Sequence, residues 1–147
     1  MSTADMLLLA VHASATAAMV GLIWFVQIVH YPLFAAVGEN SFVDYEALHT
    51  VRTGWVVGPL MGVESLSAVV IAVGLTDEVG VALAVVGLVL LVGIHASTIL
   101  LQVPAHRRLS TGFDASVHRR LVRTNWIRTV GWSLRGLVAV AMLVVAV

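Results

Sequence analysis

The chain has no cysteine and no lysine, and only 11% of its 147 residues are charged. The missing cysteine excludes disulfides, thiolate metal sites and cysteine nucleophiles. All eight basic residues are arginine, and eight acidic residues balance them, so the net charge is zero. This balance gives no sign of a nucleic-acid partner, and we expect none.

Two kinds of catalytic motif are absent as well. The sequence contains neither a glycine-rich phosphate loop nor the nucleophile elbow of serine hydrolases. Phosphoryl transfer and serine hydrolysis therefore have no motif to support them. The candidate groups that remain are histidine, carboxylate and arginine side chains.

Hydrophobic residues dominate what is present, at 60% of the chain with a mean hydropathy of +1.01. A soluble domain of this length could not keep such a surface in water, so we predict an integral membrane protein with one domain over residues 1–147. The first apolar run follows "MSTAD", which has no basic segment and no clear cleavage site. We interpret this run as a retained span rather than a signal peptide.

Four apolar stretches have the length of about 20 residues that a membrane-spanning helix needs. They cover approximately residues 6–28, 55–74, 80–101 and 127–147. The fold class predicted is an all-α, four-helix bundle. We expect the first span to stop or kink before Pro32 and the third to close at "QVP", because proline interrupts helical hydrogen bonding.

Two spans are predicted to extend beyond the membrane as helices. In "NSFVDYEALHTVRTGW" the residues Phe42, Tyr45, His49 and Arg52 recur at helical spacing, so span two should begin outside the membrane and bend near Pro59. "DASVHRRLVRTNW" should start at a capping Asp114 and run into span four.

The arginines are distributed unequally between the loops. The segment between spans three and four carries most of them, and the segment before span two carries Arg52. The first group is Arg107, Arg108, Arg119, Arg120, Arg123 and Arg128. The positive-inside rule makes these loops cytoplasmic, so both termini and the short acidic turn between spans two and three are expected outside.

A stripe of small residues lies on span two, where Gly54, Gly58 and Gly62 recur every four residues. Such stripes allow two helices in a membrane to approach closely. We expect this contact to lie within the bundle, in preference to a contact between protomers.

Span four carries a polar face formed by Asn125, Arg128, Trp132 and Arg135. Arg135 lies at a depth similar to that of Glu64 on span two, and an unpaired ionised carboxylate there is costly. We predict Arg128 and Arg135 as charge partners, with a Glu64–Arg135 ion pair. In the alternative, Arg135 reaches the headgroups and Glu64 is protonated or binds a metal.

The histidines and carboxylates suggest two separate groups. Glu46 and His49 form an E-x-x-H pair, and with His30 and His106 they lie at one membrane rim. Glu64 and His95 lie deeper, because Glu46 and Glu64 are about 27 Å apart along a continuous helix. We predict metal ligands among His30, Glu46, His49, Glu64, His95 and His106, and Glu64 and His95 as candidate catalytic acid–base groups. Imidazole and carboxylate ligands suit iron, copper or zinc; the alternative is solvated or hydrogen-bonded rim histidines.

His12 stands apart in "AVHASAT", where small neighbours leave space beside a histidine in a spanning helix. This pattern makes His12, or His95 on span three, a candidate ligand of a haem or pigment. One haem cannot be held by both, since their depths differ by about 15 Å. The alternative for His12 is a hydrogen bond to a neighbouring helix.

Several segments carry a resemblance over nearly the whole chain. They are "VHYPLFAAVG", "PLMGVES", "STILLQVPAHRRLSTGFD" and "LVRTNWIRTVGWSLRG". Together they resemble a family of small four-span bacterial membrane proteins without an assigned function, and "QVPAH" followed by "NWIRTVGW" is the most specific part. The resemblance implies the bacterial inner membrane as location. Its signature positions are His30, Tyr31, Pro32, Glu64, Pro104, His106, Asn125, Trp126 and Arg128, to which it gives no role.

In size and span pattern the chain is also distantly similar to anthrone-oxygenase-like membrane proteins, which implies oxidative chemistry on a hydrophobic substrate. Our leading hypothesis is a membrane metal or redox protein, holding iron or copper and acting like an oxygenase on a lipophilic molecule. One alternative is a non-catalytic accessory or assembly subunit. Another is a haem- or pigment-binding protein. The partners expected are the lipid bilayer, a lipophilic small molecule, and a second copy or a larger membrane complex.

Overall fold

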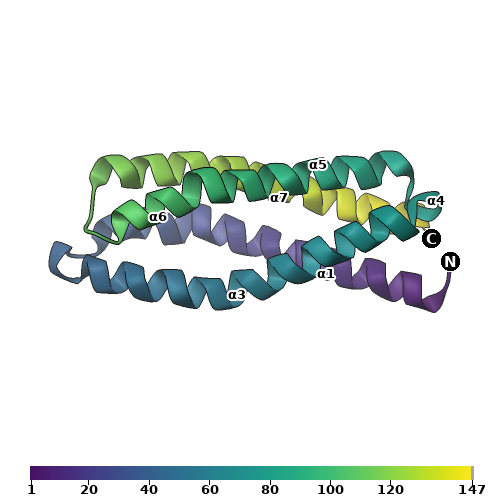
Figure 1. Cartoon of the computed structure of the whole chain (residues 1–147), viewed down its shortest axis with the longest axis horizontal. Coiled ribbons are helices and arrows are strands. Elements are labelled where there is room, and N and C mark those ends of the chain that lie inside the picture. The colour runs from purple at the N-terminus through teal and green to yellow at the C-terminus, as the bar shows by residue number, and fades with distance from the viewer. Residues whose placement is uncertain (147) are drawn as a thin grey trace.

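In the computed structural model, which describes residues 1–146, four long helices run side by side along one axis (Figure 1). They span Thr3–Ala36, Glu39–Gly74, Val81–Leu109 and Ala115–Ala146, and each is long and apolar enough to cross a membrane. The described residues form no β-strand. The prediction of an all-α, four-helix bundle is confirmed, and its apolar helices are those of a membrane protein.

The long helices are assembled from shorter elements. The first comprises α1 (Thr3–Phe25), the π-helix η1 (Val26–His30), α2 (Tyr31–Leu33) and the 3₁₀-helix η2 (Phe34–Ala36). The second is α3 (Glu39–Gly74), which is followed by the short α4 (Thr76–Val79). The third comprises α5 (Val81–Ser97), the π-helix η3 (Thr98–Gln102) and α6 (Val103–Leu109), and the fourth is α7 (Ala115–Ala146).

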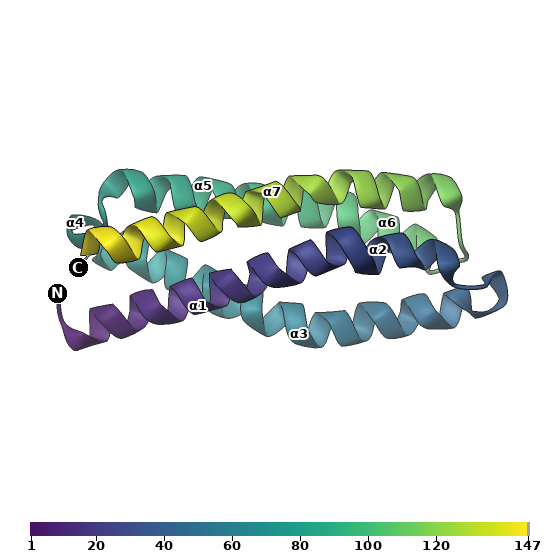
Figure 2. The same ribbon diagram turned by 180° about the vertical axis from the view of Figure 1, so that it is seen from behind.

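The N-terminus and the end of α7 lie at the end of the bundle that carries α4, as Figure 1 and its rear view in Figure 2 show. The loops between η2 and α3 and between α6 and α7 lie at the opposite end. We call this opposite end the loop end. Most of the arginines are therefore gathered there, on α6 and on the first half of α7.

The first helix does not stop before Pro32, although it is irregular there, and the expectation that the third helix closes at "QVP" is wrong. Each helix passes through a π-helical turn immediately before its proline and then continues. Tyr31 and Val103 each donate the backbone N–H to the carbonyl five residues earlier, instead of four. Such a wider turn relieves the clash that a proline ring makes with the preceding turn of a regular helix. The first helix therefore reaches Ala36 and the third reaches Leu109.

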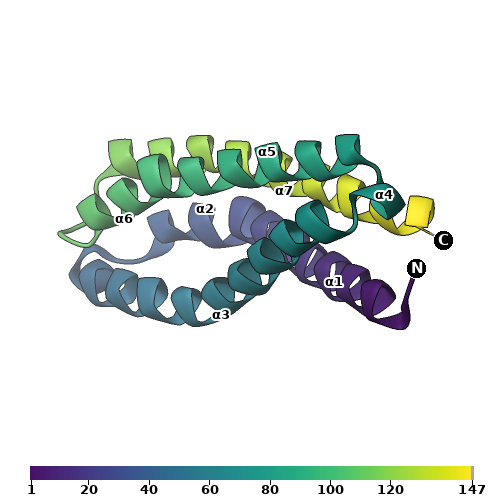
Figure 3. The ribbon, with the colours of Figure 1, turned by 45° about the vertical axis from the view of Figure 1, so that its right-hand side comes forward.

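The predicted helical extensions of spans two and four are confirmed. The 36 residues of α3 would reach about 54 Å at the usual helical rise, against about 30 Å of hydrocarbon in a bilayer. Pro59 lies inside α3, and Figure 3 shows that this helix changes direction along its length.

The other extension begins at the expected cap. Oδ1 of Asp114 accepts hydrogen bonds from the backbone N–H groups of Ser116 and Val117 and from the Ser116 hydroxyl. The hydroxyl bond, followed by the two backbone bonds, holds the pKa of the Asp114 carboxyl below its usual value. Helix α7 then runs unbroken from Ala115 to Ala146.

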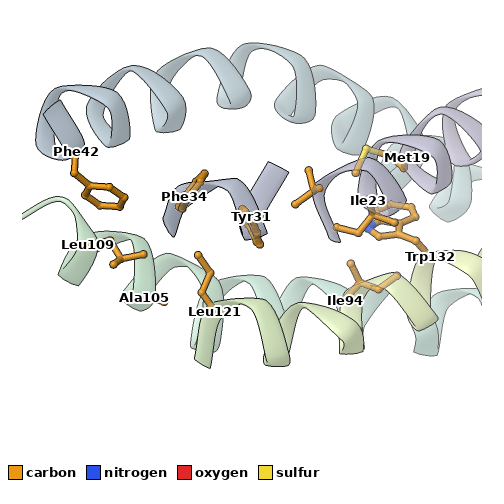
Figure 4. Packing of buried hydrophobic residues seen from close by; sticks show 11 residues of the cluster. Met19, Ile23, Tyr31, Phe34, Phe42, Ile94, Ala105, Leu109, Leu121 and Trp132 are labelled. Atoms are coloured by element: carbon orange, nitrogen blue, oxygen red, sulfur yellow. The ribbon is translucent and has the colours of Figure 1, made fainter. Parts of the chain in front are cut away.

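The bundle has two buried apolar clusters. The larger lies in the loop-end half and contains Phe34, Phe42, Leu121 and Trp132, which point inward from η2, α3 and α7 (Figure 4). The smaller lies towards the termini and includes Leu9 and Met142 among its members. Many large apolar side chains face outward instead, as expected where lipid rather than water surrounds the helices.

The glycine stripe on span two does not make the predicted contact within the bundle. Gly54, Gly58 and Gly62 are exposed, and a Cβ atom added to any of them would meet nothing within 4 Å. Close approach occurs on α7 instead. A Cβ on Gly131 would lie 2.8 Å from Cγ1 of Ile94, and one on Gly136 would lie 3.1 Å from Cγ2 of Val20. The prediction failed because small residues allow another helix to approach closely but do not determine which face of α3 another helix covers.

Candidate functional site

The polar side chains inside the bundle form two groups, as the sequence predicted. Near the loop end lie His30, Glu46, His49 and His106, which we call the His/Glu cluster. Closer to the termini lies the Glu64–Arg135 pair. The His/Glu cluster draws its members from η1, α3 and α6, so three separate helical segments must pack together to form it.

Three members of the His/Glu cluster have the spacing of a metal site. Ligand atoms of Glu46, His49 and His106 all lie within 4.8 Å of one another. Glu46 and His49 share one face of α3, because residues three apart in a helix are neighbours. His106 lies on α6, two residues after Pro104 and shortly after the π-turn η3. From there its side chain reaches Glu46 on α3.

Glu46 is engaged on one oxygen only. Nδ1 of His106 lies 2.5 Å from Oε1 of Glu46, within hydrogen-bond distance. Oε2 of Glu46 is buried and has no hydrogen-bond partner, and the whole side chain has 0% exposure. A buried carboxylate oxygen without a partner is costly, and a metal ion at this position would satisfy it. The residues present therefore fit a metal ion.

The hydrogen bond to Glu46 also fixes the chemistry of His106. When the carboxylate is ionised and the imidazole neutral, Nδ1 of His106 carries the proton and Nε2 keeps a lone pair. That Nε2 lies 2.9 Å from the Tyr31 hydroxyl. Glu46, His106 and Tyr31 thus form a chain in which the carboxylate orients the imidazole, and the imidazole can take a proton from a hydroxyl or bind a metal.

His49 is oriented in a similar way by the fourth member of the cluster. Its Nδ1 lies 2.8 Å from Nε2 of His30 and 3.1 Å from the Thr53 hydroxyl. When Nδ1 of His49 carries the proton and donates to His30, Nε2 of His49 keeps its lone pair for a metal. His30 then acts as an orienting partner of a ligand.

Aromatic rings pack around the His/Glu cluster and cover much of it. The Phe34 ring is 5.0 Å from that of His49 and 5.3 Å from that of His30, and its side chain is fully buried. Figure 4 shows Tyr31 and Phe34 between α3 on one side and α6 and α7 on the other. A low dielectric strengthens the interactions of the cluster with any charged partner.

A cavity of about 460 Å³ opens beside the His/Glu cluster. Tyr31, His49 and His106 are part of its polar wall, and Gly54, Val57 and Val103 are part of its apolar wall. Arg128 of α7 also lines it. The volume lies within the range of small-molecule sites, about 300–1,000 Å³.

The Glu64–Arg135 ion pair is confirmed. The guanidinium of Arg135 contacts Oε1 of Glu64 and donates to the backbone carbonyl of Gly87, and both charged side chains are almost completely buried. A Cβ on Gly87 would lie 3.4 Å from Nη1 of Arg135, so the missing side chain leaves room for the guanidinium. The alternative in which Arg135 reaches the headgroups is excluded by this burial.

His12 belongs to the surroundings of this pair. Its Nδ1 lies 2.9 Å from the Ser67 hydroxyl on α3, which confirms the predicted hydrogen bond to a neighbouring helix. Its Nε2 lies 3.4 Å from Nη2 of Arg135. Both ring nitrogens therefore have a partner, and neither is left free for a haem iron.

His95 and Glu64 are not members of the His/Glu cluster. Nδ1 of His95 bonds the Leu91 carbonyl and Nε2 lies 3.4 Å from the Ser65 hydroxyl, while Glu64 is occupied by Arg135. The metal and acid–base roles predicted for these two residues remain predictions. Among the predicted ligands, the structure brings together His30, Glu46, His49 and His106.

Two contributors to the site were not assigned by sequence reasoning. Tyr31 was noted only as a signature residue, yet its hydroxyl contacts His106. His118 bonds the Tyr31 backbone carbonyl at 2.8 Å and so holds that segment against α7. The "HYP" sequence could have indicated Tyr31, since an irregular turn before proline often marks a functional position.

Comparison with known proteins adds no assignment. No protein-family model matches the chain, and neither a curated protein nor a solved structure is significantly similar to it. The resemblances drawn from the sequence therefore stay predictions, and function has to be argued from the geometry.

Proposed function

We propose that the protein is a membrane metalloprotein that performs redox chemistry on a lipophilic molecule. The observation that carries the proposal is the buried Glu46–His49–His106 group, with one unsatisfied carboxylate oxygen, beside a cavity of about 460 Å³. Glu46, His49 and His106 would hold the ion. His30 would orient His49 through its hydrogen bond.

The ligand set favours iron among the metals that imidazole accepts. Two histidines and one carboxylate with open positions are typical of non-haem iron oxygenases, and copper is the second candidate. When bound, the ion would supply one-electron and oxygen chemistry. The chain's own residues would bind the ion, exclude water through Phe34 and its neighbours, and hold a proton at Nδ1 of His106.

The location proposed is the bacterial inner membrane, with both termini outside the cytoplasm. The support is that the arginine-bearing loops lie together at the loop end and the termini together at the other end. The positive-inside rule assigns the arginine-bearing side to the cytoplasm. The His/Glu cluster would then face the cytoplasmic side of the membrane.

A non-catalytic accessory subunit is the second candidate function. It is favoured by the exposed stripe of Gly54, Gly58 and Gly62, which could receive a helix of another protein or of a second copy. In that case the His/Glu cluster would be a structural hydrogen-bonded group. A haem- or pigment-binding role has less support, because both nitrogens of His12 are occupied.

Metal content and visible absorption of the purified protein test the proposal. We expect about one iron or copper per chain, retained after desalting, and no Soret-type band. Glu46→Gln and His49→Gln should each lower the metal content at least tenfold, because each removes a direct ligand. His95→Gln is the matched control and should keep the metal. A wild-type protein that binds neither iron nor copper after reconstitution contradicts the proposal.

A further inference from the structure

Arg128 is a buried cation without an acidic partner. Its side chain is only 6% exposed. Nη1 donates to Oδ1 of Asn125 at 3.3 Å, whereas Nε is buried with no hydrogen-bond partner. In the described part of the chain, the two salt bridges are Glu46–His106 and Glu64–Arg135, so no carboxylate lies within 4.0 Å of Arg128.

Helix α7 itself provides the comparison. Arg135 is just as buried, and Glu64 and the Gly87 carbonyl satisfy its guanidinium. Arg128 lies two turns earlier on the same polar face, with the Asn125 amide oxygen and the Tyr31 hydroxyl as neutral neighbours and no carboxylate in contact. Glu46, the carboxylate of the nearby cluster, bonds His106 through Oε1 and makes no ion pair within 4.0 Å of Arg128. A buried guanidinium costs several kcal/mol when it is uncompensated, which calls for a counter-anion from outside the chain.

The cavity beside Arg128 is suited to such an anion with an apolar body. Arg128 and Arg107 both line it, and Arg107 is exposed at the loop end. Val57 and Val103 offer apolar surface, and Gly54 leaves space where a side chain would otherwise project. A site with cationic side chains at one end and apolar side chains at the other suits an amphiphile, whose charged head and hydrocarbon chain need different surroundings.

We propose that this cavity binds an anionic amphiphile, with its carboxylate or phosphate on Arg128 and its hydrocarbon along Val57 and Val103. Guanidinium binds such planar or multidentate oxygen anions with two parallel hydrogen bonds. The inference deepens the proposed function and rests on it for the use of the bound molecule, because it names the substrate class of that site. The hydrocarbon of the ligand then lies beside His49 and His106, which line the same cavity.

Binding of dodecanoate to the metal-free protein tests this inference. Native mass spectrometry from a neutral detergent should show one saturable adduct per chain, and the thermal unfolding midpoint should rise with dodecanoate concentration. Methyl dodecanoate, which has the same chain and no charge, should bind at least tenfold more weakly. Equal binding of acid and ester would overturn the proposal.

Two variants locate the site. Arg128→Gln should weaken dodecanoate binding about tenfold or more, with Arg128→Lys in between. Gly54→Leu should weaken it by filling the cavity while leaving every charge in place. Gly93→Leu on α5 is the matched control, because Gly93 is also exposed and unhindered but lies outside this cavity. If Arg128→Gln does not fold, Gly54→Leu decides: unchanged affinity there overturns the proposed location.

A competition experiment distinguishes a membrane lipid from a free carboxylate as the source of the anion. Phosphatidylglycerol that displaces dodecanoate from wild type and not from Gly54→Leu would identify a membrane lipid as the occupant, and no displacement would identify a free fatty-acid-type carboxylate. Failure of metal binding would leave the dodecanoate result standing, since the protein is metal-free throughout. Loss of dodecanoate binding with metal retained would overturn this inference and leave the proposed function intact.

Discussion

At the scale of single residues, the two buried arginines of α7 differ in their partners rather than in their burial, and this difference separates a structural role from the binding role that we propose for Arg128. Arg135 has a carboxylate and a carbonyl within the bundle, so its charge serves to hold α7 to α3 and α5. Arg128 has an amide oxygen and a cavity. A sequence pattern places both on one helical face and cannot distinguish them, because the difference depends on which neighbouring helix supplies a carboxylate.

The Glu64–Arg135 pair yields a prediction in a double-mutant cycle. Glu64→Gln and Arg135→Gln should each be strongly destabilising, by about 3–5 kcal/mol, because each strands a charge in a low dielectric. The double variant should be less destabilised than the sum of the two. Unfolding in detergent measures all three, with Asp44→Asn on the exposed side of α3 as the control. Strictly additive effects would show that the two charges do not interact.

A second prediction at this scale concerns Tyr31. Tyr31→Phe removes the hydroxyl from Nε2 of His106 and keeps the ring against Phe34. If His106 binds the metal, one ligand nitrogen loses a competing partner, and we expect the metal affinity to stay within about tenfold of wild type. Tyr45→Phe, another phenol near the cluster, is the control. Complete loss of metal would make the Tyr31 oxygen itself a ligand.

At the scale of elements, the glycines of α7 predict where the bundle resists a larger side chain. Gly131→Val should be markedly destabilising, by about 1–3 kcal/mol, because its new atoms collide with Ile94. Gly58→Val on the exposed stripe should be nearly neutral for the monomer, because nothing lies near its Cβ. Thermal unfolding in detergent compares the two. A large loss at Gly58 accompanied by dissociation would reveal an interface between copies.

Helix content and most of the polar grouping could be predicted from the sequence, for a common reason. Span length, hydropathy and depth along a helix are one-dimensional properties, and they correctly separated Glu46 and His49 from Glu64 and paired Glu64 with Arg135. Two features could not be predicted. The π-turns before Pro32 and Pro104 depend on whether neighbours compensate for a broken hydrogen-bond pattern, and the free face of Gly58 depends on helix rotation.

At the scale of the whole molecule, the absence of cysteine makes the orientation testable. Single cysteines introduced as Ala4→Cys and Ala115→Cys occupy exposed positions at opposite ends of the bundle. A membrane-impermeant maleimide added to intact spheroplasts should label Ala4→Cys and spare Ala115→Cys. Permeabilised spheroplasts, in which both should react, provide the control. The reverse labelling pattern would invert the proposed topology.

The length of α3 has a consequence for how a metal ion and a lipophilic molecule would reach the His/Glu cluster. His49 lies 25 residues before Gly74, or about 37 Å along the helix, which is more than the thickness of the hydrocarbon layer. A hydrated metal ion could therefore reach the His/Glu cluster from the aqueous phase without entering lipid, where it is poorly soluble. A lipophilic molecule dissolved in the bilayer could approach the cluster from the hydrocarbon layer without entering water. The cluster would then be a site at the membrane–water interface, where a water-soluble ion and a lipid-soluble molecule meet and neither has to leave its own phase.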